Sequence, residues 1–237
     1  MGPLISRLSS RFHVIAFDFP GHGLSAPPPH AWGMDEQVEL VLRVAAKTGL
    51  TDFGIVGHSN GGRVALELAS HSPSDQGLAF LALIAPSGIR RKRGISYFIR
   101  LWTAKILKAP FLILPEKPRE LGLDWVRHSL VWRLLGSSDY RQLSGVMRET
   151  FVRTVNHYFD GGPNDSGLNN VTCDVVLFWG SDDTAITRNQ MDTMLDLLPN
   201  AGLYVVKDAG HQAQLDQPDV IAAGIAGIAG VAGVATL

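Results

Sequence analysis

The stretch Phe53-Gly-Ile-Val-Gly-His-Ser-Asn-Gly61 predicts a strand that turns abruptly into a helix. An apolar run comes first, the pentapeptide Gly57-His-Ser-Asn-Gly61 ends it, and the helically spaced run Arg63-Val-Ala-Leu-Glu-Leu-Ala69 follows. A sharp turn between a strand and a helix exposes the hydroxyl group of Ser59, and glycine makes such a strained turn sterically possible. The pattern Gly-x-Ser-x-Gly in this context indicates a nucleophilic serine.

Strand-like and helical segments alternate along the rest of the chain. The expected strands are residues 13–17, 53–57, 78–85, 175–179 and 203–206, and the expected helices are residues 35–47, 61–71 and 190–198. Residues 78–85 are continuously apolar, which is typical of a strand buried on both faces of a sheet. We therefore expect an α/β fold, with a mostly parallel sheet and helices on both faces.

The alternation stops between residues 85 and 175. Residues 95–160 are rich in Trp, Arg, Leu and Tyr, carry several prolines, and contain no strand-like run. This pattern predicts a core formed by residues 1–88 and 171–237 and a helical lid insertion formed by residues 89–170. The tryptophans of the lid are candidates for lining a pocket, although a helical Trp is more often part of a core; they are Trp102, Trp125 and Trp132.

Composition argues against several classes of partner. The chain has 237 residues, 46% of them hydrophobic, and a formal net charge of −1, so no global field favours nucleic acid or an anionic membrane. The basic run Arg90–Arg93 is more often a solvated face than a nucleic-acid site. The single cysteine excludes an internal disulfide, and the first residues lack the pattern of a signal peptide. We expect a cytoplasmic protein with a small-molecule substrate.

The C-terminal residues 220–237 contain no charged residue, and glycine recurs at every third position from Gly224 to Gly233. The length approaches that of a membrane span. Because half of these residues are Gly or Ala, the stretch is only mildly hydrophobic, and each Gly inside a helix costs about 1 kcal/mol relative to Ala. We expect a final surface helix rather than a membrane anchor.

Two later segments offer partners for Ser59. The strand at 175–179 ends in Gly180-Ser-Asp-Asp-Thr184, and the strand at 203–206 ends in Lys207-Asp-Ala-Gly-His211. In open parallel sheets, functional groups gather at the carboxyl ends of the strands. A serine, a carboxylate and an imidazole in three such loops, in that chain order, are typical of a hydrolase site.

These motifs carry a resemblance to a known family. The stretches Asp18-Phe-Pro-Gly-His-Gly-Leu-Ser25, Gly57-His-Ser-Asn-Gly-Gly-Arg63, Trp179-Gly-Ser-Asp-Asp-Thr-Ala185 and Asp208-Ala-Gly-His211 resemble those of the α/β-hydrolase superfamily, in particular its lidded esterase-like members. The resemblance extends from about residue 4 to about residue 222.

The resemblance implies a role for each site residue. His211 acts as general base toward Ser59, Asp183 orients and stabilises the imidazolium, with Asp182 as the substitute, and the backbone N–H of Asn60 contributes to an oxyanion hole. No cofactor and no metal are implied. His22, His58, Asp18 and Arg63 are interpreted as structural residues, with Arg63 as an ion-pair partner, Asp18 bound to loop backbone, and the His58 side chain directed away from the pocket.

The family pattern also includes a His-Gly loop that supplies the second oxyanion donor. The only His-Gly here is His22-Gly23, in the turn after residues 13–17. The resemblance therefore implies that the first three strands and this loop are missing, which leaves a gap in the middle of the sheet. Either the chain is a fragment, or residues 13–17 pair directly with residues 53–57.

The expected activity is that of a serine hydrolase that forms an acyl-enzyme, most simply a carboxylesterase acting on small or medium apolar esters. Alternatives within the fold are hydrolysis of a carbon–carbon bond in dienoate-type ketones and acyl transfer. A third alternative is a catalytically impaired protein that retains a binding role, because removal of one oxyanion donor typically costs a factor of about 10²–10³ in rate.

Overall fold

The structure is a computed structural model, and the residues it describes are 1–71, 77–92, 102–103, 106, 110, 115, 117–118, 143, 145–160 and 167–234. The chain divides into two compact units, one formed by Met1–Arg91 with Val152–Leu237 and the other by Lys92–Phe151. Most of the expected lid, including Trp125 and Trp132, lies outside the described residues. The lid assignment therefore stays a prediction, and the fold described below is that of the larger unit.

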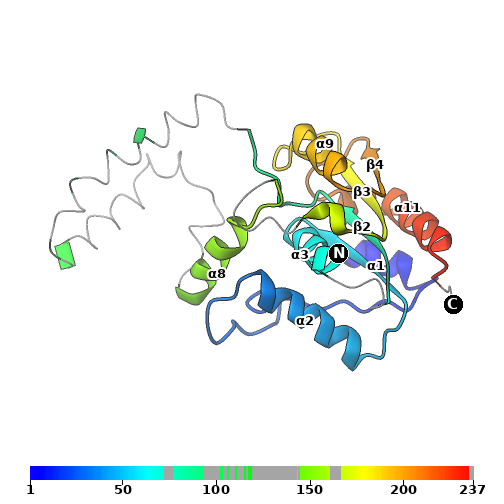
Figure 1. The fold of residues 1–237 in the computed structure, drawn as a ribbon, viewed down its shortest axis with the longest axis horizontal. Coiled ribbons are helices and arrows are strands. Elements are labelled where there is room, and N and C mark those ends of the chain that lie inside the picture. Colours follow the sequence, from blue (N-terminus) through cyan, green and yellow to red (C-terminus); the bar gives the residue numbers. More distant parts are fainter. Residues whose placement is uncertain are drawn as a thin grey trace. The chain divides into compact units, whose positions relative to one another are not determined.

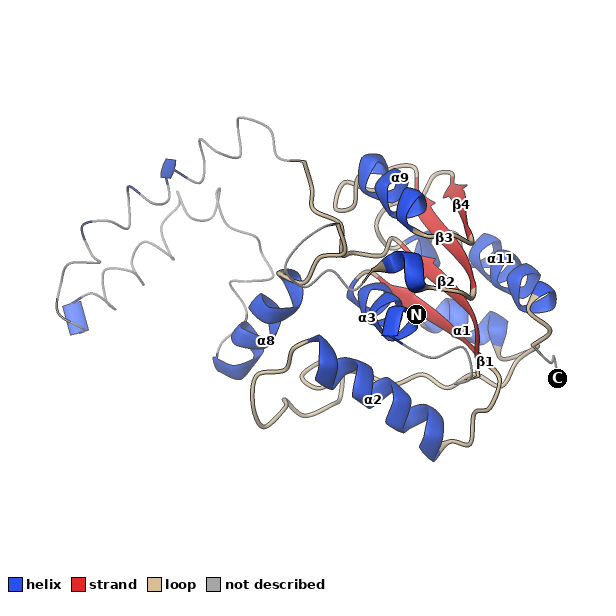
Figure 2. Cartoon of the chain, in the orientation of Figure 1, coloured by secondary structure: helices blue, strands red, loops and turns tan. Residues whose placement is uncertain are grey.

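A four-stranded sheet forms the centre of the larger unit (Figure 2). Its strands are β1 (Phe53–His58), β2 (Leu78–Ile84), β3 (Asp174–Gly180) and β4 (Ala201–Val206). They lie in the order β1-β2-β3-β4, and each neighbouring pair is parallel. All the carboxyl ends therefore meet at one edge, and the predicted α/β fold with a parallel sheet is confirmed.

Helices cover both faces of this sheet (Figure 1). One face carries α3 (Asn60–His71) and α9 (Arg188–Leu197), and the opposite face carries α1 (Gly2–Leu8) and α11 (Pro218–Val231). The other elements of this unit are α2 (Met34–Lys47), a 3-10 turn (Leu168–Asn170) and α10 (Ala213–Asp216), while α8 (Gly145–Val155) begins in the smaller unit and ends in the larger one. The helices expected at 35–47, 61–71 and 190–198 are confirmed, with small shifts at their ends.

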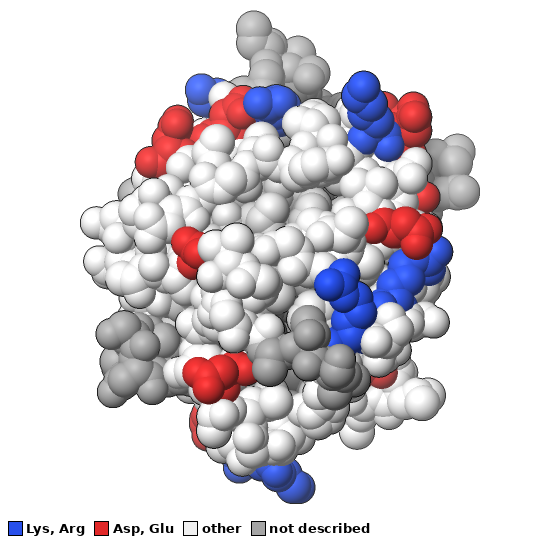
Figure 3. Space-filling view, turned by 90° about the vertical axis from the view of Figure 1, so that its right-hand side faces the viewer, with Lys and Arg blue, Asp and Glu red and all other residues white. Residues whose placement is uncertain are grey.

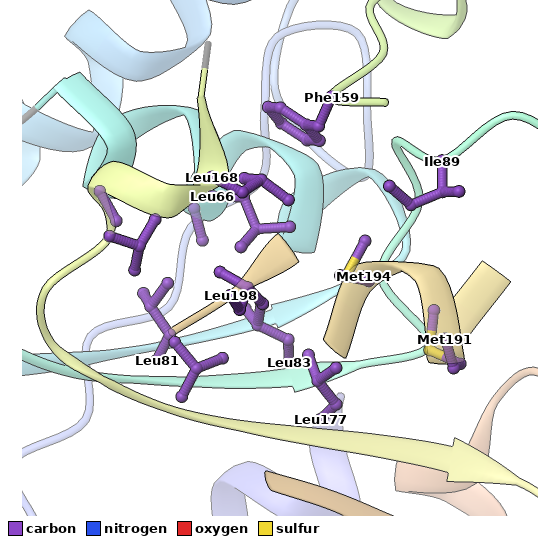
Figure 4. Packing of buried hydrophobic residues seen from close by; sticks show 14 of the residues in the cluster. Leu66, Leu81, Leu83, Ile89, Phe159, Leu168, Leu177, Met191, Met194 and Leu198 are labelled. Carbon is purple, nitrogen blue, oxygen red and sulfur yellow. The ribbon is translucent and has the colours of Figure 1, made fainter. Parts of the chain in front are cut away.

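The two hydrophobic layers explain the continuous apolar run of β2. Leu81 and Leu83 pack in the cluster that includes α3 and α9, whose close packing around Leu66 and Met194 is shown in Figure 4. Phe80, which alternates with them, belongs to the cluster under α1 and α11. All of these side chains are at most 4% exposed. Because β2 has no solvent-facing side, almost every residue in it must be apolar.

The expected strand at residues 13–17 is wrong. These residues form no strand, and β2 is the only described strand that pairs with β1, so direct pairing between residues 13–17 and β1 is also wrong. A cavity of about 840 Å³ is lined by both residues 12–19 and residues 50–56. A β-branched run adopts strand structure only where a neighbour completes its hydrogen bonds, and none of the described strands pairs with this segment.

One edge of β1 faces this cavity. The N–H groups of Phe53 and Ser59 both donate in the direction of β2, to the carbonyl groups of Gly77 and Ile84. Backbone groups of a strand alternate between its two sides. The peptide groups of Gly54 therefore point away from β2, and this residue lines the cavity.

The C-terminal helix α11 packs against the sheet with one stripe of side chains. Ile221, Ile225 and Ala229, spaced by four residues, are buried. Arg7 of α1 pairs with Asp219 of α11, with an Nη2–Oδ2 distance of 2.9 Å. The face shown in Figure 3 is mostly neither acidic nor basic, and its charged side chains are scattered, some of them with Lys or Arg next to Asp or Glu. The expected surface helix is confirmed, and no helix among the described residues has the length and apolar character needed to cross a membrane.

Candidate active site

Ser59 occupies a strained turn between β1 and α3, which we call the elbow. Its φ angle is 52°, in the left-handed region that costs a non-glycine residue about 1–3 kcal/mol. The Ser59 N–H donates to the carbonyl group of Ile84 at 3.0 Å, and the Ser59 carbonyl accepts from the N–H of Arg63 at 3.2 Å. These bonds tie the turn to β2 and to the first turn of α3, and so hold Ser59 in the strained conformation.

The two glycines of the pentapeptide differ in the space available for a side chain. A Cβ atom at Gly57 would lie 2.7 Å from the carbonyl oxygen of Gly61, which is a backbone clash. A Cβ atom at Gly61 would meet nothing within 4 Å. The strained turn therefore requires glycine for steric reasons at position 57 only.

His211 lies between Ser59 and Asp183. Its Nε2 atom is 3.2 Å from the Ser59 hydroxyl oxygen, and its Nδ1 atom is 2.9 Å from Oδ2 of Asp183. A carboxylate only accepts hydrogen bonds, so Nδ1 carries the proton and Nε2 presents its lone pair to the serine hydroxyl. The structure thus brings together the three residues singled out by the sequence, from the loops that follow β1, β3 and β4.

The Asp183 carboxylate is fixed by the backbone of its own loop. Its side chain is 0% exposed, and Oδ1 accepts hydrogen bonds from the N–H groups of Ala185 and Ile186 at 2.7 and 3.0 Å. Asp182, the substitute considered from the sequence, is exposed and accepts a hydrogen bond from the Ser181 hydroxyl instead. The geometry therefore favours Asp183 as the partner of His211.

Asn60 is the first residue of α3. The first four N–H groups of a helix have no partner inside it, and the partial positive charge of that end favours an anion. The backbone N–H of Asn60 is thus available as a donor beside Ser59, while its side-chain amide donates to Oε1 of Gln37 at 3.1 Å.

Gln37 is a residue near the site that sequence reasoning missed. It is 5% exposed, and its amide nitrogen donates to the carbonyl group of Gly33 and to the Thr154 hydroxyl, both at 2.9 Å. It therefore links α2 to the residue that follows Ser59. The available signal was a polar residue next to the apolar face of the helix 35–47, but its partners Asn60 and Thr154 are remote in the sequence.

His58 contacts the loop of His211. Its Nε2 atom lies 2.9 Å from the carbonyl oxygen of His211, and the two imidazole rings lie 4.9 Å apart between centroids. Burial lowers the pKa of His58 below its ordinary value. The interpretation of His58 as a structural residue is consistent with this contact, which is made to a backbone atom rather than to Ser59.

The other residues interpreted as structural make local contacts. Asp18 accepts a hydrogen bond from the N–H of Leu24 at 3.2 Å, as expected for a loop residue, and His22 contacts the carbonyl of Pro20. Arg63 is 5% exposed and donates to the carbonyl oxygen of Thr154. Burial lowers the pKa of Arg63 to about 10. The expectation of an ion pair for Arg63 is replaced by this bond to a backbone carbonyl.

Arg90 and Arg91 of the basic run contact other parts of the chain. Arg90 forms an ion pair with Asp160 at 2.9 Å and lies over the ring of Tyr158, 4.7 Å from its centroid. Arg91 donates to the carbonyl group of Thr184 at 3.4 Å. Arg93 lies outside the described residues. For Arg90, the contacts explain a cation at this position without an external ligand.

Comparison with known proteins identifies relatives that are similar in sequence along most of this chain. The chain is 29% identical over 217 residues to the dihydrolipoyllysine-residue acetyltransferase component of an acetoin cleaving system from Cupriavidus necator, covering 89% of this chain and 54% of that protein. It is 23% identical over 229 residues to the monoacylglycerol lipase ABHD6 of Bos taurus, covering 91% of this chain and 66% of that protein. The chain thus spans between about half and two thirds of the length of these relatives.

Solved structures agree at the level of the fold. An esterase from Thermogutta terrifontis superposes with a TM-score of 0.66 at 19% identity, covering 98% of this chain and 84% of that chain. A meta-cleavage product hydrolase from Pseudomonas fluorescens superposes with a TM-score of 0.65 at 16% identity, covering 98% of this chain and 84% of that chain. The family described as "Alpha/beta hydrolase family" matches residues 1–224. With the parallel sheet and the elbow at Ser59, this match shows that the chain belongs to the alpha/beta hydrolase family.

Proposed function

We propose that this chain is a serine hydrolase that cleaves carboxylic esters through an acyl-enzyme. The observation that carries the proposal is the continuous hydrogen-bonded line from Ser59 through His211 to Asp183. Its members come from three separate loops, so their alignment at hydrogen-bond distances does not follow from local sequence. A hydroxyl, a base and a buried carboxylate in this order form the constellation that activates a serine.

The reaction has two halves. The Ser59 hydroxyl oxygen attacks the ester carbonyl carbon while His211 Nε2 takes the hydroxyl proton, which gives a tetrahedral intermediate and an imidazolium ion. His211 then returns the proton to the departing alkoxide, so that the alcohol leaves and an acyl group remains on Ser59. Water then attacks the acyl carbon while His211 takes one of its protons, and His211 returns this proton to the Ser59 oxygen as the bond to the acyl group breaks and the acid is released.

Other groups stabilise the charge that develops in these steps. Asp183 faces the imidazolium with a carboxylate that is buried and already bonded to two backbone N–H groups. We assign the oxyanion to the N–H of Asn60, at the amino end of α3, where the helix dipole favours negative charge. The choice of carboxylic esters is supported by the names of the relatives, which include a lipase and an esterase.

A fluorophosphonate probe tests the proposal, because it phosphonylates activated serines. The wild-type chain is expected to become labelled, and Ser59→Ala is expected to abolish the labelling. Ser10→Ala is the matched control, since the Ser10 hydroxyl bonds only to the carbonyl of Arg7 in α1, on the opposite face of the sheet from α3. Hydrolysis of p-nitrophenyl esters from acetate to octanoate then reports the preferred acyl length.

One observation supports a second candidate function. The cavity lies along one edge of β1, so β2 is the single described strand beside it. The elbow is therefore supported by a neighbouring strand on one edge of β1 only. A catalytically impaired hydrolase-like binding protein would retain the fold and the three residues without turnover. Absence of labelling from a folded wild-type chain, judged by circular dichroism, would favour this second function.

A further inference from the structure

We propose that His58 is a positioning residue that holds the loop of His211 against the strand that carries Ser59. The inference rests on the proposed hydrolase function, because it assigns His58 a role in setting the distance between nucleophile and base. The observation behind it is the 2.9 Å contact between Nε2 of His58 and the carbonyl oxygen of His211.

The contact closes a ring of bonds around the reacting atoms. Ser59 follows His58 directly in the chain, and its hydroxyl oxygen lies 3.2 Å from Nε2 of His211. The side chain of His211 thus points to Ser59 while its backbone carbonyl accepts from His58. Two adjacent residues at the end of β1 hold both ends of the catalytic histidine.

The other anchors of this loop come from different elements. The N–H of Asp182 donates to the carbonyl of Ala209 at 2.9 Å, and the N–H of Gly210 donates to the carboxylate of Asp216 at 2.8 Å. These bonds fix the loop relative to β3 and α10. Among the hydrogen bonds of the described backbone of this loop, only the one from His58 links His211 directly to β1.

The partner of His58 determines which nitrogen atom of its ring carries the proton. A carbonyl oxygen can only accept, so Nε2 of His58 must carry a hydrogen atom. Burial keeps the ring neutral, because it lowers the pKa of His58. The ring is therefore the Nε2–H tautomer, and a neutral ring 4.9 Å from His211 leaves that histidine free to take up a proton without a second cation beside it.

Three variants separate this role from simple packing. His58→Gln places an amide nitrogen near the position of Nε2, His58→Asn places one near Nδ1, and His58→Phe keeps the ring without a donor. We expect Phe and Asn to lower kcat by about 10- to 100-fold with KM changed less than about 3-fold, since a small displacement of a catalytic group has effects of this size. Gln is expected to retain most of kcat, and the melting temperatures of Gln and Asn are expected to agree.

The result that would overturn the proposal is equal activity in the Gln and Asn variants, or a wild-type rate in the Phe variant. A measurement independent of turnover is the imidazole ¹⁵N spectrum of the wild-type chain. Nε2–H on His58 and a displaced His211 signal in the Phe variant are expected, and an Nδ1–H tautomer of His58 would overturn the contact. Failure of Ser59-dependent labelling contradicts the hydrolase function instead, and leaves the spectrum as the test of the contact.

Discussion

At the scale of single residues, the two neighbouring aspartates after β3 differ in every physical respect that matters for catalysis. The side chain of Asp183 is fully buried and bonded to His211, whereas Asp182 is exposed and bonded to a serine hydroxyl. The family resemblance favoured Asp183, but the carboxylate one residue away was an alternative that only the three-dimensional arrangement could separate.

Asp183→Asn is expected to lower kcat of ester hydrolysis by about 10⁴-fold with the fold unchanged. An amide at this position can donate to Nδ1 of His211, which would stabilise the tautomer that has no lone pair at Nε2 to accept the serine proton. Steady-state kinetics and circular dichroism check this. Asp182→Asn is the control, and its kcat is expected to stay within about 3-fold of the wild-type value because an exposed carboxylate contributes little.

Residue-scale prediction from the sequence identified side chains that lie together where a local motif carries the information. Ser59, Asp183 and His211 each lie in a short motif at the end of an apolar run, and the structure places them at hydrogen-bond distances, while their catalytic roles stay a prediction. Gln37 and the contact of His58 could not be predicted, because their partners are distant in the chain: 117 residues separate Gln37 from Thr154, and 153 residues separate His58 from His211.

At the scale of elements, the elbow predicts opposite outcomes for its two glycines. Gly57→Ala is expected to destabilise the fold by about 2–4 kcal/mol, because the added Cβ would lie 2.7 Å from a backbone oxygen that cannot easily move. Gly61→Ala, inside α3 and in open space, is expected to stabilise it by up to about 1 kcal/mol. Urea denaturation measures both, and equal effects would contradict the packing described for the elbow.

The glycines of α11 offer a second comparison within one helix. A Cβ atom at Gly224 would lie 2.6 Å from the ring of Phe178, whereas Gly227 has nothing within 4 Å. Gly227→Ala is therefore expected to raise the free energy of unfolding by about 0.5–1 kcal/mol, and Gly224→Ala to lower it. Thermal unfolding of the two variants checks this, and a stabilising Gly224→Ala would show that α11 does not approach β3 as described.

A helix or strand could be predicted from the sequence when its residue pattern alone was enough to identify it. β2 was recognisable because burial on both faces makes the whole run apolar. Residues 13–17 show an equally strand-like composition and form no strand, since a strand also requires a neighbour that the pattern does not reveal. The register and order of the strands, by contrast, follow from tertiary pairing.

At the scale of the whole molecule, a buried polar contact joins α3 to the segment that follows α8. Glu67 of α3 lies 2.7 Å from Nε2 of His157, and the two side chains are 8% and 11% exposed. Glu67→Ala is expected to lower the free energy of unfolding by about 3 kcal/mol, because it leaves a buried imidazole without its partner. Glu39→Ala, which removes an exposed pair with Arg43, is expected to change it by less than about 1 kcal/mol in the same urea titration.

The cavity beside β1 has a consequence for colloidal behaviour. An unpaired strand edge is a template for association with other chains, and folded proteins suppress this by covering such edges with a loop or with charge. In this molecule residues 12–19 form the loop on the open side of β1. They form no strand, so no strand-to-strand hydrogen bonds keep them in place. We therefore expect aggregation of the native chain to begin under conditions that loosen this loop, below the unfolding transition.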